Sequence, residues 1–297
     1  MITCSAPAKI YLFGEHAVVY GEPAIACAAE LRTYVTVEPA SSTTVVSGGV
    51  PTRIETTPYI TEALKKIRRI HPIPDVSIQI TSDIPTGAGV GSSAALTVAL
   101  LQALSIEFGV DIDVLQIASM AYDVELSVQG AASQTDTFIS TMGGMALMPD
   151  RMFLPHLECS IVIGDTNMRG KTSTMVSKVA ELKNAYPEVA EHIIKSIGIL
   201  AQTGVPLLES KDYLGVGRLM NINHGLLESL GVGTFPLSQL VYRARDAGAF
   251  GAKITGAGGG GCMVALTDKP EDVIRSIECC YGKAMVVKPA REGVREE

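Results

Sequence analysis

Between residues 85 and 95 the chain reads Pro85-Thr86-Gly87-Ala88-Gly89-Val90-Gly91-Ser92-Ser93-Ala94-Ala95. This stretch follows residues 76–81, which alternate as a strand does, and leads into residues 92–108, which are rich in Ala and Leu and read as a helix. Glycines allow a backbone to adopt positive φ and to approach a ligand closely. A helix that begins at Ser92 directs its unpaired N–H groups and positive dipole end into the loop, and such an end binds phosphate.

The loop residues are therefore candidates for holding a phosphate group. The hydroxyls of Ser92 and Ser93 also suit Mg²⁺, a hard cation that prefers oxygen ligands. The predicted phosphate-binding residues are Gly87, Ala88, Gly89, Val90, Gly91, Ser92 and Ser93.

The glycine pattern has three competing interpretations. Residues 89–94 fit the dinucleotide pattern G-x-G-x-x-A, but that motif expects a later strand with an acidic end, whereas residues 109–114 open another helix. A P-loop is nearly matched by Gly164 and Gly170-Lys171-Thr172, but five residues separate the two glycines where the motif has four. A tight strand–helix turn with a serine cap, without any ligand, stays open.

The composition excludes several classes of function. The chain has 297 residues, of which 47% are hydrophobic and 19% charged, and its net charge is −7. Nucleic acids and anionic membranes call for clustered Lys and Arg, so neither is expected as a partner. The six cysteines show no C-x-x-C pair, which favours buried free thiols. No signal peptide or membrane-spanning run is evident, and we expect a cytoplasmic protein.

The remaining patterns predict a mixed α and β chain. Helices are expected at residues 58–70, 111–129 with Asp111 as N-cap, 176–184, 189–203, 213–230 and 236–247. Strands are expected at residues 9–13, 31–37, 143–148, 159–164, 252–255 and 262–267.

We place a domain boundary at residue 155, with domains of residues 1–155 and 156–297, and expect the charged tail from Arg291 to fray. The basic cluster at residues 65–69 is either a phosphate-binding face or a solvated helix face.

Two further motifs contain residues that are unusual for their surroundings. Near the N-terminus stands Pro7-Ala8-Lys9-Ile10-Tyr11-Leu12-Phe13-Gly14-Glu15-His16, which places a lysine inside an apolar strand although lysine is rarely buried without a partner. Glu15 and His16 follow at the strand end, where they can project into a cleft or simply decorate the surface. Near the C-terminus stands Lys253-Ile254-Thr255-Gly256-Ala257-Gly258-Gly259-Gly260-Gly261-Cys262, whose backbone must lie close to a ligand or to another domain.

Together, in this order, the three motifs resemble those of the GHMP kinases, across essentially the whole chain. The continuation Ala17-Val18-Val19-Tyr20-Gly21-Glu22-Pro23-Ala24 resembles the mevalonate kinases of that superfamily, most closely the archaeal ones. The resemblance implies an α+β fold of two domains: an N-terminal ribosomal-protein-like α/β domain that binds the nucleotide and a C-terminal ferredoxin-like domain. The site would lie between the two domains.

The resemblance also implies roles for particular residues. Relatives have a Mg²⁺-binding Glu and, eleven residues later, a catalytic Asp, and Glu125 and Asp136 have this spacing. Ser93 would share the Mg²⁺ with Glu125, and Lys9 would lie beside Asp136, keeping it ionised and stabilising the transferring phosphoryl group. The implied substrate-binding residues are Glu15, His16, Thr172, Gly256 and Ala257, with His16 as a donor to a carboxylate. The segment Ala131-Ala132-Ser133-Gln134-Thr135-Asp136 departs from the more familiar Asn-Pro-Ser-Gly-Val-Asp, so the geometry before Asp136 is less defined.

The implied activity is transfer of the γ-phosphoryl group of ATP, with Mg²⁺, to the hydroxyl of (R)-mevalonate. A homodimer is compatible with the family. A sister kinase that acts on phosphomevalonate is one alternative, although an added phosphate would demand cations that the segment around Glu15 and His16 lacks. A nucleotide-binding sensor without catalysis is another, and it is disfavoured because Lys9, Glu125 and Asp136 are all present.

Overall fold

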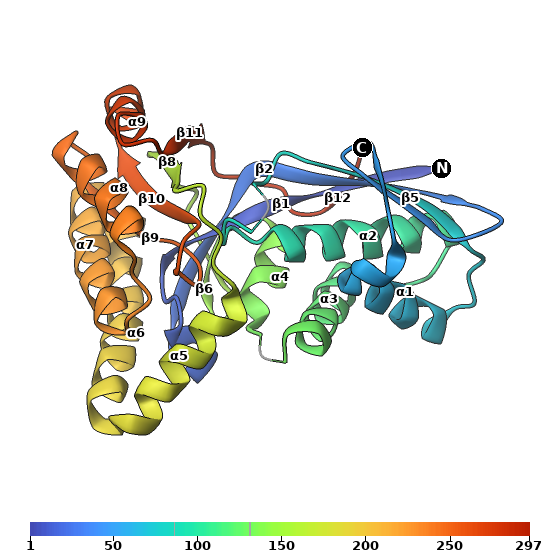
Figure 1. Ribbon diagram of the computed structural model, residues 1–297, viewed down its shortest axis with the longest axis horizontal. Helices are drawn as coiled ribbons and strands as arrows, with labels where there is room; N and C mark the ends of the chain where they lie inside the picture. The colour runs from blue at the N-terminus through green and yellow to red at the C-terminus, as the bar shows by residue number, and fades with distance from the viewer. Residues whose placement is uncertain (86, 131) are drawn as a thin grey trace.

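The computed structural model describes residues 1–85, 87–130 and 132–297. These residues form two lobes, each with its own sheet, and both chain ends lie on the first lobe (Figure 1). Thr86 and Ala131, which belong to motifs quoted above, lie outside the described residues.

The first sheet has the strand order β12-β1-β2-β5-β3-β4, with β6 paired to β2 and β7 to β6, and the second has the order β11-β8-β10-β9. The strands are β1 Ile2–Phe13, β2 Ala24–Pro39, β3 Thr44–Ser47, β4 Val50–Thr52, β5 Val76–Ser82, β6 Met145–Met148, β7 Met152–Leu154, β8 Ser160–Asp165, β9 Gly251–Ile254, β10 Cys262–Thr267, β11 Lys283–Val287 and β12 Arg295–Glu296. The first sheet thus takes strands from both ends of the chain.

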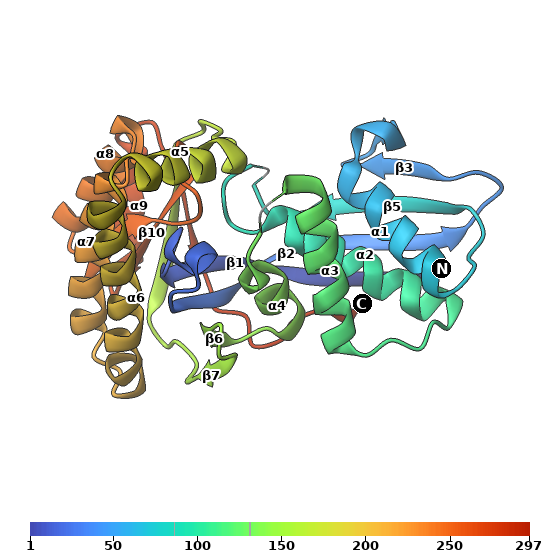
Figure 2. The same ribbon diagram turned by 90° about the horizontal axis from the view of Figure 1, so that it is seen from below.

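Each sheet is covered by helices on one face. Figure 2 shows α1–α4 over the first sheet, and α7–α9 cover the face of the second sheet that points away from the first lobe (Figure 1). The helices are α1 Pro58–Ile70, α2 Ser92–Phe108, α3 Val114–Gln129, α4 Gln134–Met142, α5 Thr172–Ala185, α6 Pro187–Glu209, α7 Tyr213–Ser229, α8 Phe235–Asp246 and α9 Pro270–Glu278, with 3₁₀ turns at Ala17–Tyr20 and Ile54–Thr56. None of the helices in these described residues is long and apolar enough to span a membrane.

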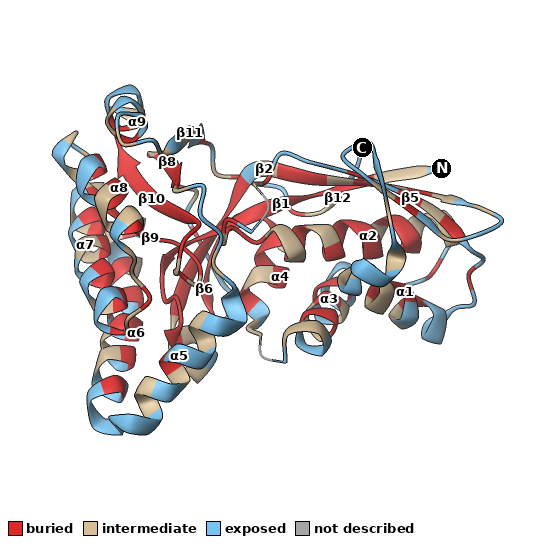
Figure 3. Ribbon diagram, in the orientation of Figure 1, coloured by how far each residue is buried: buried red, intermediate tan, exposed pale blue. Residues whose placement is uncertain are grey.

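Strand β1 positions the future site. It pairs with β2 along almost its whole length, from Ile2 opposite Val37 to Phe13 opposite Ile25, and it is buried from Cys4 onward (Figure 3). Because side chains alternate across a strand, Ala8, Ile10 and Leu12 enter the main core while Lys9 and Tyr11 point to the other face. Packing of α2 against β1 and β2 holds this strand in the middle of the lobe.

Several expected elements are confirmed, and some details are wrong. The helix over residues 58–70 and the helix that begins at Ser92 form as predicted. The third helix, however, is capped by Asp113 rather than Asp111, because the Asp113 carboxylate accepts from the Gln116 N–H (2.8 Å) while the Gln116 side chain accepts from the Asp113 N–H (2.6 Å). The cysteines are free, and Cys4, Cys27, Cys159 and Cys262 are buried. Lys66 pairs with Asp123 and Arg68 with Asp75, which favours a solvated face for the basic cluster.

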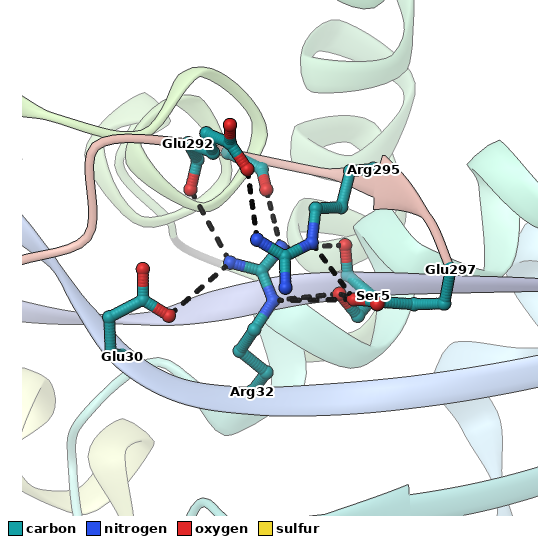
Figure 4. A network of polar contacts seen from close by, with 7 residues as sticks. Ser5, Glu30, Arg32, Glu292, Arg295 and Glu297 are labelled. Atoms are coloured by element: carbon teal, nitrogen blue, oxygen red, sulfur yellow. Dashed lines mark hydrogen bonds and ion pairs between the residues drawn. The ribbon is translucent and has the colours of Figure 1, made fainter.

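The expectation of a frayed C-terminal tail is wrong. Residues 295–296 form β12 and pair with β1, and the buried side chain of Arg32 clasps the tail (Figure 4). Its guanidinium donates to the Ser5 hydroxyl (2.7 Å) and to the carbonyl of Gly293 (2.5 Å), and the Ser5 hydroxyl in turn donates to Glu297. The charge of the tail does not make it disordered, because its acidic residues lie close to the buried guanidinium of Arg32. The division at residue 155 stays a prediction, with the qualification that the tail packs on the first lobe.

Candidate active site

A cavity of about 380 Å³ lies where β1, the start of α2, the start of α4 and the loop between β9 and β10 meet. Residues of all three sequence motifs line it, among them Lys9, Gly91 and Gly256, and Asp136 lines it as well. Segments that are far apart in the sequence therefore meet at one site between the two lobes.

The glycine-rich loop opens directly onto the first turn of α2. Gly91, the residue before the helix, has φ +81° and no side chain to cap the first amides, so these N–H groups are left for a ligand. A Cβ on Gly91 would lie 3.3 Å from Cβ of Lys9, a tight contact that, together with the positive φ, favours glycine where the loop passes over β1. Gly87, Gly89, Ser92 and Ser93 also line the cavity.

Two of the predicted phosphate-binding residues face the protein instead. Ala88 and Val90 are buried and are not among the described residues that line the cavity. The carbonyl of Val90 accepts from the Lys9 N–H (2.9 Å), and that of Ala88 accepts from the Cys262 N–H (3.1 Å). These two residues fasten the loop to β1 and β10 while the glycines between them face the cavity.

The second glycine-rich loop, residues 256–261, packs backbone to backbone on the first. A Cβ on Gly256 would overlap the carbonyl oxygen of Gly89, and a Cβ on Gly261 would lie 2.7 Å from that of Ala88. Of the two expected neighbours of this motif, a ligand or another domain, the structure shows the second, because the loop contacts the first glycine-rich loop of the other lobe. Gly256, Ala257, Gly258 and Gly260 also line the cavity.

Lys9 and Asp136 form an ion pair at the cavity. Nζ of Lys9, which is 1% exposed, lies 2.9 Å from Oδ1 of Asp136, which comes from the first turn of α4 and is 23% exposed. The Tyr11 hydroxyl donates to the same carboxylate oxygen (3.1 Å). A partly accessible carboxylate beside a buried cation is suited to accept a proton or to orient a hydroxyl.

Glu125 has a buried carboxylate that can accept further hydrogen bonds or bind a cation. Its Oε1 accepts from Gln129 (3.1 Å), and its Oε2 has no hydrogen-bond partner among the described residues. Burial and, next, the charge of Asp136 raise the pKa of Glu125 to about 8. Glu125 lines the same cavity as Ser93 and the first glycine-rich loop, and its orphaned carboxylate oxygen fits Mg²⁺, which binds through one or two carboxylates together with substrate phosphates.

Replacing Glu125 by Gln is expected to stabilise the ligand-free protein at alkaline pH. Because the folded pKa of Glu125 lies above its unfolded value of about 4.3, its contribution to the stability of the fold falls as pH rises from there toward 8. Gln cannot ionise, so Glu125→Gln should raise Tm by about 3–8 °C at pH 8.5 and by little at pH 5. Thermal unfolding across this range checks the prediction; a variant that tracks the wild type at both pH values contradicts it.

Glu15 is engaged in a buried ion pair at the cavity wall. Its carboxylate contacts Nζ of Lys253 and accepts from Nδ2 of Asn223 (3.1 Å), and both charged side chains are at most 1% exposed. Burial raises the pKa of Glu15 and lowers that of Lys253, while their mutual attraction opposes both shifts. Glu15 lines the cavity, yet its charge is already matched by Lys253.

His16 lies at the cavity with a positive φ of 60°, and its Nε2 is 2.9 Å from the carbonyl oxygen of Ala257. Because a carbonyl only accepts, Nε2 must carry the proton. Burial lowers the pKa of His16, so the ring is neutral near pH 7 and its Nδ1 is an acceptor. The ring therefore suits a ligand hydroxyl better than the carboxylate expected from the sequence.

Two family models match the chain: that of the GHMP kinases N terminal domain over residues 58–144, and that of the GHMP kinases C terminal domain over residues 205–284. The chain is also 40% identical over 327 aligned residues to the mevalonate kinase of Thermococcus sibiricus, which covers 100% of this chain and 98% of that protein. The chain belongs to the GHMP kinase family. It is 39% identical to the mevalonate kinase of Archaeoglobus fulgidus, with 99% of each chain covered.

The structural comparison agrees with the expected two-domain α+β fold of the GHMP kinases. The crystal structure of the Methanococcus jannaschii mevalonate kinase superposes with a TM-score of 0.82 at 27% identity, covering 97% of this chain and 98% of that one. The match extends over both lobes, so the arrangement of the two sheets is that of the family.

In this GHMP kinase, most of the site residues predicted from the sequence lie at the one cavity. The cavity is lined by Lys9, Glu15, His16, Gly87, Gly89, Gly91, Ser92, Ser93, Glu125, Asp136, Thr172, Gly256 and Ala257. Residues that sequence reasoning assigned no role are Tyr11, Gln129, Asn223, Lys253 and Thr255. Lys253 alone carried a readable signal, since it is a lysine inside an apolar strand, as Lys9 is.

Proposed function

We propose that the protein transfers the γ-phosphoryl group of ATP to the hydroxyl of (R)-mevalonate, forming 5-phosphomevalonate for isoprenoid biosynthesis. The observation that carries the proposal is the Lys9–Asp136 ion pair beside the orphaned oxygen of Glu125, at the uncapped start of α2. Full-length similarity to proteins named as mevalonate kinases supports the choice of acceptor.

In this proposal the chain aligns two substrates and balances charge, which is most of what phosphoryl transfer requires. The amides of Gly87, Gly89, Gly91, Ser92 and Ser93 hold the triphosphate. Ser93 and Glu125 would hold Mg²⁺, which would neutralise charge on the phosphates of the nucleotide. Among the described residues no group of three or more His, Cys, Asp or Glu side chains is placed to hold a metal ion by itself.

Asp136 acts on the acceptor. Its carboxylate takes or orients the proton of the mevalonate hydroxyl, and Lys9 stabilises the developing alkoxide and the migrating phosphoryl group. The end of the cavity that takes the acceptor is lined by His16, Thr172, Gly256 and Ala257. Glu15 also lines it, and its carboxylate is paired with Lys253.

The charge of the cavity favours an acceptor without a phosphate group. Lys9 is the single Lys or Arg among the described residues that line the cavity, and its charge is matched by Asp136. A phosphorylated acceptor would place a second dianion there without a partner, at a large cost in desolvation. This disfavours phosphomevalonate as the acceptor.

A coupled ADP-release assay with Mg·ATP tests the proposal against mevalonate, phosphomevalonate, homoserine and galactose in parallel. Turnover on mevalonate alone is the expected result. Turnover on another of the four contradicts the assignment of the acceptor, and silence on all four with ATP still bound indicates a nucleotide sensor.

Ser93→Ala should raise the Mg²⁺ concentration needed for half-maximal activity, because one of two protein oxygens for the metal is lost. Titration of Mg²⁺ at fixed ATP measures the effect. Ser82→Ala is a matched control, since the Ser82 hydroxyl pairs with Thr33 (2.8 Å) on the first sheet, outside the cavity. An unchanged Mg²⁺ requirement in Ser93→Ala removes Ser93 from the metal site.

A further inference from the structure

Tyr11 lies on the same face of β1 as Lys9, two residues away, and its side chain is 5% exposed at the wall of the cavity. The backbone N–H of Tyr11 donates to the Thr255 hydroxyl (3.0 Å), which comes from the loop after β9. The position of Tyr11 is thus fixed by both lobes.

Three contacts join Tyr11 to the reacting groups. Its hydroxyl donates to Oδ1 of Asp136 (3.1 Å) and lies 3.3 Å from the Ser133 hydroxyl, and Nζ of Lys9 lies 3.8 Å from the centre of its ring. The ammonium therefore sits over the ring in a cation–π contact while it pairs with the same Oδ1. Among the described residues, no donor reaches Oδ2 of Asp136.

The phenol has a single proton, and its direction follows from its neighbours. A carboxylate only accepts, whereas the Ser133 hydroxyl can donate or accept, so the proton goes to Asp136 and Ser133 serves as donor to the phenol oxygen. Hydrogen bonds to an ionised group are the stronger kind, which favours the same arrangement. Burial, followed by the charge of Asp136, raises the pKa of Tyr11 well above its ordinary value, so the phenol stays a donor at working pH.

We propose that Tyr11 is a positioning residue: with Lys9 it holds Oδ1 of Asp136, so that Oδ2 is the oxygen turned toward the acceptor alcohol. The inference rests on the proposed function. It adds that Oδ2 of Asp136 is the oxygen that meets the hydroxyl, and that Lys9 and Tyr11 fix the plane of the carboxylate. Lys9 alone holds Oδ1 by one ionic contact, whereas Lys9 and the Tyr11 hydroxyl together restrain the same oxygen and so limit rotation of the carboxylate.

The test is Tyr11→Phe, which keeps the ring under Lys9 and removes only the hydroxyl. The single-turnover rate of phosphoryl transfer should fall about ten-fold, the scale of one lost hydrogen bond to a charged group, while KM for ATP and for mevalonate stays within about two-fold. Tyr213→Phe is the matched control, because the Tyr213 oxygen accepts from the Glu158 N–H (3.1 Å) outside the cavity; its rate should equal that of the wild type.

A double-mutant cycle with Asp136→Asn separates positioning from a general structural effect. If Tyr11 acts through Asp136, Tyr11→Phe should change the residual rate of Asp136→Asn by less than about two-fold. An unchanged rate in Tyr11→Phe, a raised KM for mevalonate at unchanged rate, or an equal ten-fold loss in both backgrounds overturns the inference. A wild-type protein silent on every alcohol instead overturns the proposed function, and the inference with it.

Discussion

Replacing Asp136 by Asn is expected to lower kcat by at least about 10²-fold, the lower end of the effect of losing a general base, with ATP binding nearly intact. Asn keeps the shape of the side chain and can still accept from Lys9 and Tyr11 through its carbonyl oxygen. It cannot take the proton of the acceptor, and it removes the negative charge beside the buried Lys9. The loss should therefore appear in the chemical step.

Steady-state kinetics with mevalonate and equilibrium binding of ATP together measure this effect. Asp123→Asn is the matched control, because Asp123 pairs with Lys66 (2.8 Å) on the surface of the helical layer, where such a pair contributes little. It should retain wild-type kcat. Near-normal turnover by Asp136→Asn would remove Asp136 from the mechanism.

Replacing Lys253 by Met should destabilise the fold by about 3–5 kcal/mol, the usual cost of breaking a buried ion pair from one side. Lys253 and Glu15 are at most 1% exposed, and Met leaves the Glu15 carboxylate with Asn223 as its remaining donor (3.1 Å). The destabilisation arises from the uncompensated charge of Glu15. Urea unfolding at pH 7 measures it as a lower midpoint at similar slope.

The double variant Lys253→Met with Glu15→Gln should recover most of the lost stability, because the buried charge is then absent. Lys195→Met provides the control, since its pair with Glu191 (2.9 Å) is exposed and its loss should cost less than about 1 kcal/mol. A Lys253→Met variant as stable as the Lys195 control contradicts a buried, charged Glu15.

The parts of the site that repeat a local pattern could be predicted from the sequence. The glycine-rich turn into α2 follows from glycines placed before an Ala- and Leu-rich helix, and Lys9 is recognisable as a cation within an apolar strand. The roles of Glu125 and Asp136 came from the family resemblance, since neither has a local signal. The structure places both at the cavity.

Other parts depend on contacts that no local pattern contains. Tyr11 is an ordinary strand residue in the sequence, and its meeting with Asp136 joins positions 125 residues apart. The partner of Glu15 is 238 residues away, so the sequence could indicate that Lys253 needs an anion without saying which one. The tail was expected to fray because its charges were judged without knowledge of Arg32.

Because the C-terminal tail pairs with β1 and is held there by Arg32, one edge of the first sheet forms late in synthesis. Strand β1 is synthesised before the second lobe, and its edge partner β12 is synthesised after it. On the ribosome the edge of β1 in the nascent first lobe therefore stays unpaired until β12 has been made, and other chains can pair with such an open edge. When residues 295–296 emerge they pair with β1 at Cys4 and Ser5, so this part of the edge is protected only after the second lobe has been synthesised.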